Sequence, residues 1–288
     1  MKILVTGCNG QLGRELHEVL EARKPGVTEY VDFAELNICD AQAVKTFVEN
    51  GGYTHIINCA AYTAVDRAEE EKIECMAANA DGVRNLAEAA ADTGAHMLHI
   101  STDYVFDGTA HRPYRESDKP APTSHYGVTK RRGETALLSF APDAIIVRTG
   151  WLYSPYGNNF VKTMLRLARQ NGKLNVVADQ IGTPTYAHDL AEMIATMVLA
   201  PQWIAGTYHF SNTGVASWYD FAQAIVDIAG LKGSVPVKPL LSEDFPTAAT
   251  RPFYSVLDKT KIMATYQVDI PHWRHALEKC MERMKNEE

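Results

Sequence analysis

Two residues with complementary chemistry, Tyr126 and Lys130, lie four positions apart near the middle of the chain. Residues at this spacing share one face of a helix. A free tyrosine titrates near ~10, and a neighbouring cation favours the phenolate and lowers that pKa toward neutrality. Such a tyrosine can exchange a proton with a substrate oxygen at cellular pH. Many solvated helices carry the same spacing, so the hypothesis depends on what the rest of the sequence provides.

A glycine-rich turn close to the N-terminus provides a place for a nucleotide. A short apolar run over residues 2–6 is followed by Gly7, Gly10 and Gly13, and then by a helical pattern of apolar residues. The first glycine permits the tight turn, the second lets the backbone approach a pyrophosphate, and the third lets the helix pack closely on the strand. The helix N-terminus adds unpaired N–H groups and a positive dipole end. The pattern predicts a dinucleotide-binding unit.

Two residues bear on which dinucleotide would bind. Asp32 lies near the end of a strand expected over residues 29–32, where a carboxylate takes the ribose hydroxyls of an adenosine and favours NADH. Arg14 follows the last glycine and either meets the 2′-phosphate of NADPH or is an ordinary solvated helix residue. The sequence therefore leaves the choice between NADPH and NADH open.

The next strand, expected over residues 55–58, ends in small residues. Small side chains there leave room for a cofactor against the backbone, or else allow tight helix packing. A long helix is expected over residues 68–91. Asn79 lies within it, although asparagine is a mediocre helix former. It is either an exposed polar residue or one that holds a water or a carbonyl near the site.

A fourth apolar strand, residues 96–100, leads to hydroxyl-bearing residues that include Thr102. Hydroxyls at the carboxyl edge of a parallel sheet face the ligand crevice. A polar loop over residues 107–125 then leads to Tyr126 at the start of a helix. Thr102, Tyr126 and Lys130 are therefore expected to converge, with a hydroxyl to polarise a carbonyl, a phenol to protonate it and a lysine to tune the phenol. Beside NAD(P)H, this set would make a ketone reductase.

These features resemble the extended short-chain dehydrogenase/reductase family. Within it the sequence is most similar to the reductases that act on the nucleotide sugar dTDP-4-dehydrorhamnose. The motifs that carry the resemblance span nearly the whole chain and are TGxxGxxG at residues 6–13, the strand end at 58–61, Ala-Tyr-Thr-Ala-Val-Asp at 61–66, Ser-Thr-Asp-Tyr-Val-Phe at 101–106, the pair Tyr126/Lys130, Gly-Asn-Asn-Phe at 157–160 with Met164, and Arg251-Pro252 ahead of Ser-Val-Leu-Asp at 255–258.

The resemblance implies that Tyr126 donates the proton, that Lys130 tunes it and binds the nicotinamide ribose, and that Thr102 contacts the substrate carbonyl. With the glycine turn, it leads us to expect NADPH, or alternatively NADH, at Gly7, Gly10, Gln11, Leu12, Gly13, Asp32, Asn37, Ile38, Ala60, Ala61, Tyr62, Thr63, Asn79, Ile100, Tyr126 and Lys130. Substrate contacts are expected at Thr102, Asp103, Trp151, Asn159 and Arg251.

Two of the expected substrate residues have structural alternatives. Trp151 follows an apolar strand at residues 144–147 and so lies at another carboxyl edge, but an indole there can also belong to a packed core. Arg251 offers a planar fork that suits the diphosphate of a sugar nucleotide, and its alternative is a surface salt bridge.

No metal is expected. In some members of the family, carboxylates that include one at the position of Glu15 bind magnesium at a dimer interface. The position near a second such carboxylate is occupied here by His188, which puts a metal-bridged dimer in doubt. His272 and His275 have helix spacing but no further Cys or His cluster nearby, so they are interpreted as surface histidines.

The second half of the chain departs from simple strand–helix alternation. Glycine- and proline-rich junctions separate strands expected over residues 175–177 and 206–210 from helices over 187–199, 218–228 and 272–284. The sequence predicts an α/β protein: a Rossmann-type doubly wound parallel sheet over residues 1–150, and a smaller C-terminal α/β substrate-binding lobe over residues 151–288. Segments of the second half are allowed to return to the main sheet.

Composition limits the classes of partner. The chain has 288 residues, a net charge of −7 and no basic block, which argues against nucleic acid. The five cysteines are scattered and odd in number, as in a cytosolic protein with reduced thiols. No apolar run approaches a membrane span, and a strand-like segment begins at residue 3 without a leader pattern. We expect a cytoplasmic protein, with a homodimer left open.

The resemblance implies NAD(P)H-dependent reduction of the C4 ketone of dTDP-4-dehydro-β-L-rhamnose to dTDP-L-rhamnose. One alternative is another nucleotide-sugar reductase, epimerase or dehydratase of this fold. A dehydratase would need an acid/base pair, often Asp-Glu, directly after Thr102, and here Asp103 is followed by Tyr104. The other alternative is a non-catalytic cofactor-binding regulatory subunit, but such proteins usually lose the tyrosine or the lysine.

Overall fold

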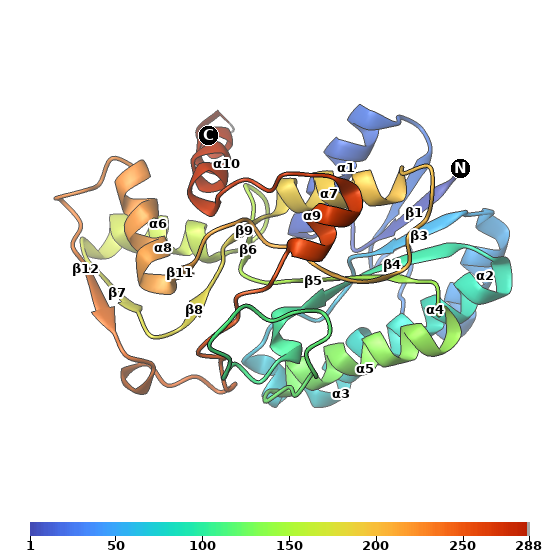
Figure 1. Cartoon of the computed structure of the whole chain (residues 1–288), viewed down its shortest axis with the longest axis horizontal. Helices are drawn as coiled ribbons and strands as arrows, with labels where there is room; N and C mark the ends of the chain where they lie inside the picture. The colour runs from blue at the N-terminus through green and yellow to red at the C-terminus, as the bar shows by residue number, and fades with distance from the viewer. Residues whose placement is uncertain (287–288) are drawn as a thin grey trace.

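A six-stranded parallel sheet forms the centre of the computed structural model, which describes residues 1–286 (Figure 1). Its short apolar strands are largely buried, as expected for a parallel sheet that carries helices on both faces. In spatial order the strands are β10 (Gly206–His209), β5 (Ile145–Thr149), β4 (His96–Thr102), β3 (His55–Asn58), β1 (Ile3–Thr6) and β2 (Thr28–Val31).

The strand order reverses beside β1. The chain passes from β1 to β2 on one side and then returns to β3 on the other, with Thr6 opposite Asn58. In doubly wound sheets, ligands bind in the crevice outside the carboxyl ends of the strands at such a switch point. The glycine turn after β1 and the small residues after β3 therefore lie where a nucleotide crevice is expected.

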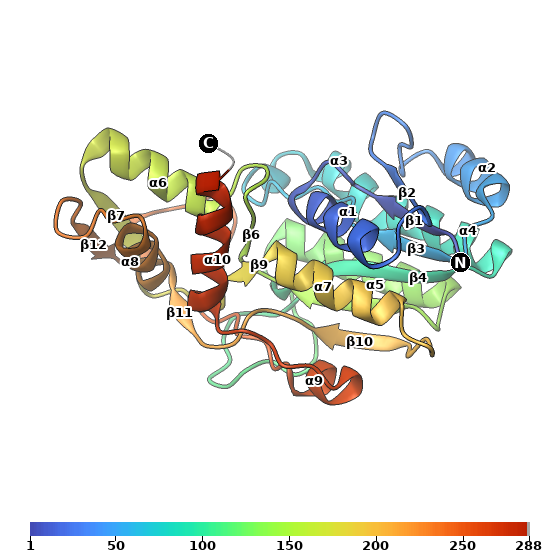
Figure 2. The ribbon, with the colours of Figure 1, turned by 90° about the horizontal axis from the view of Figure 1, so that it is seen from above.

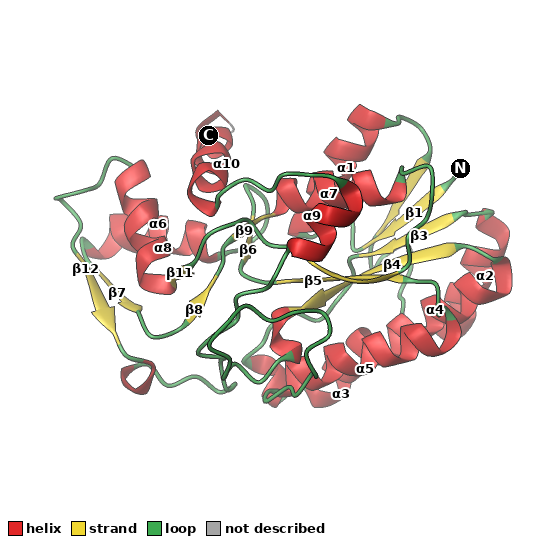
Figure 3. Ribbon diagram, viewed as in Figure 1, coloured by secondary structure: helices red, strands yellow, loops and turns green. Residues whose placement is uncertain are grey.

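Helices cover the sheet in two layers, above and below it in Figure 3. Each layer packs leucine, valine, isoleucine and alanine side chains against one face. One layer contains α1 (Gln11–Arg23), α7 (Ala187–Val198) and α9 (Thr260–Tyr266). The other contains α2 (Ala41–Gly51), α4 (Gly82–Thr93) and α5 (His125–Phe140).

The second lobe lies beside the sheet and has its own aromatic-rich core around Tyr153, Phe221 and Leu277 (Figure 2). Its helices are α6 (Phe160–Asn171), α8 (Trp218–Ile228) and α10 (Trp273–Asn286). Its short strands are β6 (Leu152–Tyr153), β7 (Leu174–Val177), β8 (Ile181–Gly182), β9 (Thr185–Tyr186), β11 (Ala216–Ser217) and β12 (Val237–Leu240).

The second half of the chain also contributes to the central sheet. Strand β10 pairs with β5 at its edge, and α7 packs against α1. The observed α/β architecture, a parallel Rossmann-type sheet with a smaller lobe, is the predicted fold class. The division near residue 150 stays a prediction. Within residues 1–286, no helix combines the length and the apolar character that crossing a membrane requires.

One expected helix is wrong in detail. Residues 68–91 form a 3₁₀ turn (Arg67–Glu69), helix α3 (Lys72–Met76), a π-helical turn (Ala77–Asp81) and α4, rather than one helix. The break falls at Glu71, whose carboxylate accepts hydrogen bonds from Tyr62 and Arg67. These tertiary contacts override the helical pattern of the sequence.

Candidate active site

Helix α5 carries Tyr126 and Lys130 on its buried side, with 9% and 2% of their surfaces exposed. The helix begins after Ser124, whose hydroxyl accepts a hydrogen bond from the backbone N–H of Gly127 at 3.2 Å. Gly127 also packs so closely against the carbonyl oxygen of Tyr104 that a Cβ atom would collide with it. The cap and this contact fix the first turn of α5, and with it the direction of the Tyr126 side chain.

Thr102, the last residue of β4, reaches the same point from the sheet. Its hydroxyl lies close enough to the Tyr126 phenol to lower the pKa of the phenol. The same hydroxyl accepts a hydrogen bond from the backbone N–H of Tyr104 at 3.2 Å and donates one to Asp103 Oδ1 at 3.0 Å. Phenol and hydroxyl are therefore near enough to contact one substrate oxygen together.

The protonation of Tyr126 differs from the sequence-based expectation. Burial raises the pKa of the phenol above its ordinary value, and this outweighs the opposing influence of Thr102. The expectation that Lys130 would bring the phenol toward neutrality is wrong for this structure, because burial disfavours the phenolate. The neutral phenol is the form that donates a proton, which suits a reduction.

Lys130 is held by uncharged partners. Its Nζ atom donates a hydrogen bond to the backbone oxygen of Ile100 at 2.6 Å and lies 3.4 Å from His99 Nε2. Burial lowers the pKa of Lys130 to about 8. This amine can therefore change its protonation state near physiological pH, which an exposed lysine does not do.

Asp103 is a buried carboxylate next to Thr102, with 2% of its surface exposed. Burial raises its pKa to about 6. Gly150 lies against this carboxyl group, so that a Cβ atom there would be 2.5 Å from Oδ2. That Oδ2 atom is buried and has no hydrogen-bond partner of ordinary length among residues 1–286. A longer contact with Ser255 lowers the pKa of this carboxyl group, although by less than burial raises it.

The glycine turn fits the phosphates of a dinucleotide. Gly7 has a φ of +69°, and a Cβ atom there would lie 2.6 Å from the backbone nitrogen of Ala60. Gly13 packs against the backbone of Gly7 and Cys8, which brings α1 close to β1. Gly10, in contrast, is exposed and has no side chain to cap α1. The first N–H groups of α1, at Gln11 and Leu12, are thus left for an anionic group.

The two residues that bear on the cofactor's identity lie on either side of Asn9. Asp32 accepts hydrogen bonds from the backbone N–H groups of Asn9 and Phe33, both at 2.8 Å. The Nε of Arg14 donates to the backbone oxygen of Asn9 at 3.3 Å, and its guanidinium lies 5.5 Å from the ring centre of Tyr156. Both a carboxylate and a guanidinium are therefore near the expected ribose position, and the choice of cofactor remains open on geometry.

The other expected nucleotide contacts belong to two loops. The side chain of Asn37 accepts a hydrogen bond from the backbone N–H of Cys39 at 3.0 Å, and Ile38 is buried with its oxygen bonded to Asn85. Across the crevice Ala61, Tyr62 and Thr63 are half-buried or exposed. Their contacts with a nucleotide stay predictions.

Asn79 forms hydrogen bonds with the backbone of the loop that contains Tyr62. Its side chain is fully buried, accepts a hydrogen bond from the backbone N–H of Tyr62 at 2.9 Å and donates to the oxygen of the same residue at 3.0 Å. It also donates to Thr129 at 3.2 Å. The π-helical turn places Asn79 here. Its geometry is that of a residue that shapes the loop, and direct contact with a cofactor stays a prediction.

Trp151 lies where the second lobe meets the sheet. Its φ of +52° is unusual for a residue with a side chain. Its indole stacks on that of Trp218 in α8, with ring centres 3.5 Å apart and planes within 3°. A Cβ atom at Gly182 would lie 2.5 Å from this indole. The packed-indole alternative is thus observed, and a substrate contact through the remaining surface stays a prediction.

Asn159 and Arg251 join the second lobe to the nucleotide half. The Asn159 Nδ2 donates to Gln11 Oε1 at 3.0 Å, directly beside the glycine turn. Arg251 forms an ion pair with Asp66, with Nη2 and Oδ2 2.6 Å apart. The salt-bridge alternative for Arg251 is thus observed. Its Nε is buried and makes no hydrogen bond within the described chain, and the guanidinium also lowers the pKa of the neighbouring Tyr104 phenol.

No metal was expected, and the residues that bear on this expectation form a cluster between α1, α7 and α10. One atom each of Glu15, Glu18 and His188 lie within 4.8 Å of one another, a grouping that could hold a metal ion. The guanidinium of Arg283 donates to Glu15 at 2.8 Å and to Glu18 at 2.9 Å. A cation of the chain itself thus already compensates both carboxylates. The absence of a metal stays a prediction.

Three residues at the site were not identified from the sequence. Asp66 pairs with Arg251, Trp218 stacks on Trp151, and His99 lies against Lys130. His99 had a signal, since it interrupts an otherwise apolar strand. Asp66 ends the Ala-Tyr-Thr-Ala-Val-Asp motif, but its pairing with the distant Arg251 had no signal in the sequence, and neither had Trp218.

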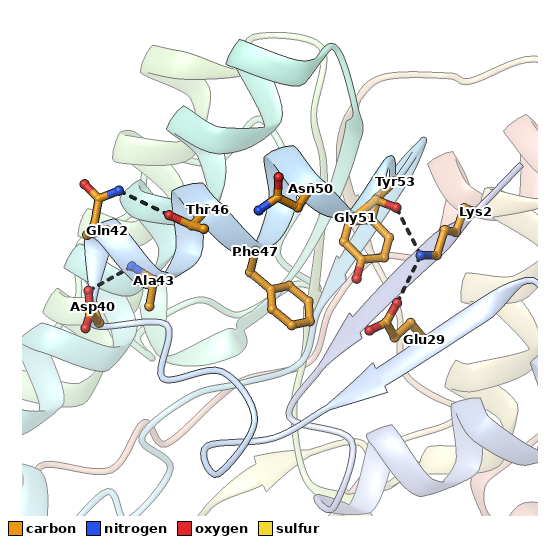
Figure 4. Close-up of a pocket in the computed structure, with 10 residues that line it drawn as sticks. All are labelled: Lys2, Glu29, Asp40, Gln42, Ala43, Thr46, Phe47, Asn50, Gly51 and Tyr53. Atoms are coloured by element: carbon orange, nitrogen blue, oxygen red, sulfur yellow. Dashed lines mark hydrogen bonds and ion pairs between the residues drawn. The ribbon is translucent and has the colours of Figure 1, made fainter.

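An open groove of about 610 Å³ lies elsewhere on the molecule (Figure 4). It is lined by residues that include Lys2, Glu29 and Tyr53, at the amino ends of β1, β2 and β3. Lys2 is paired with Glu29 at 3.1 Å and with the backbone oxygen of Gly51 at 3.0 Å. The charge of Lys2 is thus compensated. The groove lies at the amino ends of the strands, whereas ligands of such sheets bind at the carboxyl ends.

Comparison with known proteins gives one consistent family. The sequence model described as RmlD substrate binding domain matches residues 1–286. A dTDP-4-dehydrorhamnose reductase of Aggregatibacter actinomycetemcomitans is 43% identical over 284 residues, which cover 96% of this chain and 97% of that protein.

Two solved structures agree with this family. A dTDP-4-dehydrorhamnose reductase of Clostridium acetobutylicum has a TM-score of 0.93 and 42% identity, with 99% of this chain and 100% of that chain covered. A dTDP-4-dehydrorhamnose reductase of Bacillus anthracis, in complex with NADP, has a TM-score of 0.93 and 41% identity, with 98% and 100% covered.

Proposed function

This chain belongs to the family of the RmlD substrate binding domain, and from that membership we propose that it is an NAD(P)H-dependent dTDP-4-dehydrorhamnose reductase. It reduces the C4 ketone of dTDP-4-dehydro-β-L-rhamnose to dTDP-L-rhamnose, the last step of dTDP-rhamnose biosynthesis. The observation that supports the proposal most is that Thr102 and the buried phenol of Tyr126 lie close enough for Thr102 to lower the pKa of the phenol.

NADPH is the cofactor we propose, with NADH as the alternative, because a relative 41% identical in sequence is in complex with NADP. Its phosphates would be held by the backbone of Gly10, Gln11 and Leu12. Asp32 and Arg14 would flank the adenosine ribose. When bound, the reduced nicotinamide supplies the hydride that reaches C4 of the sugar.

The protein's own contribution is the proton. Thr102 would hydrogen-bond the ketone oxygen, and Tyr126 would give that oxygen its proton as negative charge develops. The burial that raises the pKa of Tyr126 keeps the phenol protonated until then. Lys130 would stabilise the resulting phenolate and bind the nicotinamide ribose.

Recognition of the sugar nucleotide would use residues from both halves of the chain. Asp103, next to Thr102, would contact a sugar hydroxyl. Trp151 would contact the sugar, and Asn159 would contact the ligand beside the glycine turn. The guanidinium of Arg251 would contact the diphosphate.

The test is an assay of NADPH consumption with dTDP-4-dehydrorhamnose, and the sugar product is identified by NMR. We expect dTDP-L-rhamnose, with weaker or no turnover of a ketosugar that differs in ring stereochemistry. Repeating the assay with NADH measures the cofactor preference. Cofactor lost on dialysis favours a reductase over an epimerase, which holds its nicotinamide permanently.

The decisive variant is Tyr126→Phe. Loss of a positioned proton donor should lower kcat by roughly 10²–10⁴-fold, while NADPH still binds in a fluorescence titration. Near wild-type turnover would contradict the assignment of the proton donor. Absence of turnover by the wild-type protein with cofactor bound would favour a regulatory subunit instead.

The surroundings of the enzyme are also proposals. The five cysteines are thiols without disulfides, which suits the reducing cytoplasm. A homodimer stays a prediction and is tested by analytical ultracentrifugation. The product would be a donor for cell-surface polysaccharide synthesis.

A further inference from the structure

A chain of buried polar groups runs beneath the candidate active site, from β1 to α5. Thr6 Oγ1 donates to Asn58 Oδ1 at 2.7 Å, and Asn58 Nδ2 lies 3.1 Å from His99 Nδ1. His99 Nε2 lies 3.4 Å from Lys130 Nζ. Asn58 and His99 are fully buried, and Thr6 and Lys130 are 1% and 2% exposed. Each polar atom in the chain therefore depends on its neighbours for a partner.

The direction of every hydrogen bond follows from one backbone group. The N–H of Ala60 can only donate, and it points at Asn58 Oδ1 at 3.1 Å. The amide of Asn58 is thereby oriented, and its NH₂ group must face His99. His99 Nδ1 consequently accepts a hydrogen bond and carries no proton. The ring is neutral, with its single N–H on Nε2, and burial accordingly lowers the pKa of His99 well below its ordinary value.

This Nε2–H faces the amine of Lys130. An ammonium has no lone pair and cannot accept a hydrogen bond, whereas a neutral amine can. The contact is therefore repulsive for the charged lysine and attractive for the neutral one. A hydrogen bond to the neutral form of a group disfavours its charged form.

The other ionisable groups around Lys130 do not restore its charge. Burial raises the pKa of Cys59, at the end of β3, to about 12, and raises that of Cys75 in α3, so both thiols are neutral. The carboxylate of Glu134, one turn along α5, raises the pKa of Lys130, but it is paired with Arg148 and its effect is smaller than that of burial. The buried phenol of Tyr126 is also uncharged.

We propose that His99 is a positioning residue for the reduction, which uses its Nε2–H to stabilise the neutral amine of Lys130 and so lets this lysine release a proton toward Tyr126. The proposal rests on the proposed function. After Tyr126 has protonated the sugar oxygen, the phenolate needs a proton. Lys130 gives one up, with the nicotinamide ribose as the expected bridge, and its amine then accepts the N–H of His99 until solvent returns a proton.

The sign of the pH effect follows from this scheme. The reduction uses protonated Lys130, so kcat/KM should fall as the pH rises through the pKa of that lysine, about 8. Removing the opposing N–H should raise this pKa. The basic limb of the pH profile should then move to higher pH by about one pH unit.

The test variant is His99→Asn. The Asn Oδ1 occupies nearly the position of Nδ1 and can still accept from Asn58, but nothing replaces the N–H that faces Lys130. His99→Gln is a second variant, because its longer side chain can offer Lys130 a carbonyl oxygen and should raise the pKa at least as much. Two measurements are made: the pH profile of kcat/KM, and a direct titration of Lys130 by NMR of protein labelled at the lysine Cε. The Lys130 signal is assigned by its absence in Lys130→Met.

The matched control is His96→Asn, in the same strand. His96 lies at the other end of β4, against Asp143 and Trp203. The His96→Asn variant should change neither the basic limb of the pH profile nor the pKa of Lys130. An unchanged Lys130 titration in both His99 variants would overturn the proposal, as would a uniform loss of activity without a shifted limb. If the protein does not reduce the ketosugar, the proposed function fails, and the NMR titration still decides the role of His99.

Discussion

Lys130 and Glu134 lie one turn apart on the same helix and are buried to nearly the same degree, yet their surroundings are opposite. Both Glu134 oxygens receive hydrogen bonds from Arg148, at 2.7 and 2.8 Å, and one also receives a bond from Ser101 at 2.6 Å. Although burial alone would raise its pKa, these donors lower it, and the carboxylate stays charged. Lys130 meets a backbone carbonyl and a neutral imidazole, and its pKa is lowered to about 8.

The difference separates structure from chemistry. A buried charge that is paired with an opposite charge and fully hydrogen-bonded keeps its protonation state. Removing one partner leaves the other charge buried and uncompensated, which destabilises the protein. A buried charge without a counter-ion is only weakly held and can change its protonation state. On this view Glu134 anchors α5 to the sheet, and Lys130 is the residue of the pair that takes part in the reaction.

The largest expected effect comes from Lys130→Met. We expect kcat to fall by roughly 10²–10⁴-fold, because a participant in proton transfer is lost. The free energy of unfolding should stay the same or rise by about 1 kcal/mol, because the uncompensated ammonium is no longer buried. Steady-state kinetics and urea denaturation measure the two effects. A stability loss as large as that of Glu134→Gln would break the comparison.

Glu134→Gln should show the reverse pattern. The change leaves the guanidinium of Arg148 buried without a counter-charge, and we expect a loss of about 3–5 kcal/mol in the free energy of unfolding. Urea denaturation followed by circular dichroism measures the loss. Retention of wild-type stability would mean that the ion pair does not anchor α5.

Arg274→Ala sharpens the comparison with an exposed pair. Arg274 contacts Asp227 at 2.8 Å, but the two side chains are 42% and 34% exposed. Solvent screens such a pair, so we expect a stability loss of about 1 kcal/mol or less and unchanged kinetics. The same denaturation experiment serves as the measurement. A loss comparable to that of Glu134→Gln would show that burial is not what distinguishes these pairs.

Local signals predicted much of the fold. Alternation of apolar runs, glycine turns and helical patterns placed the strands that contain Ile57, Leu98 and Val147, and the helix over residues 218–228 agrees with its observed bounds. These signals act over a few residues, where backbone sterics and periodicity decide the structure. The pattern over residues 68–91 failed because contacts of Glu71 and Asn79 with Tyr62 broke the helix.

The sequence predicted which residues belong to the candidate site better than it predicted their pKa values. Tyr126 and Lys130 share the buried side of α5 and Thr102 lies near the Tyr126 phenol, while the roles of the three residues stay predictions. The direction of the Tyr126 pKa shift was wrong, because a sequence does not show how deeply a phenol is buried. His99 and Trp218 were missed because each acts through a partner from another element.

The sequence by itself determined the nucleotide turn, the Tyr126–Lys130 spacing and the alternating α/β pattern, since each is written in residues that are neighbours along the chain. Tertiary structure alone decided which charges are compensated. Arg148 reaches Glu134 from β5, and His99 reaches Lys130 from β4. The free energy of a buried charge depends on the groups that surround it in space, and those groups come together only when the sheet and α5 pack.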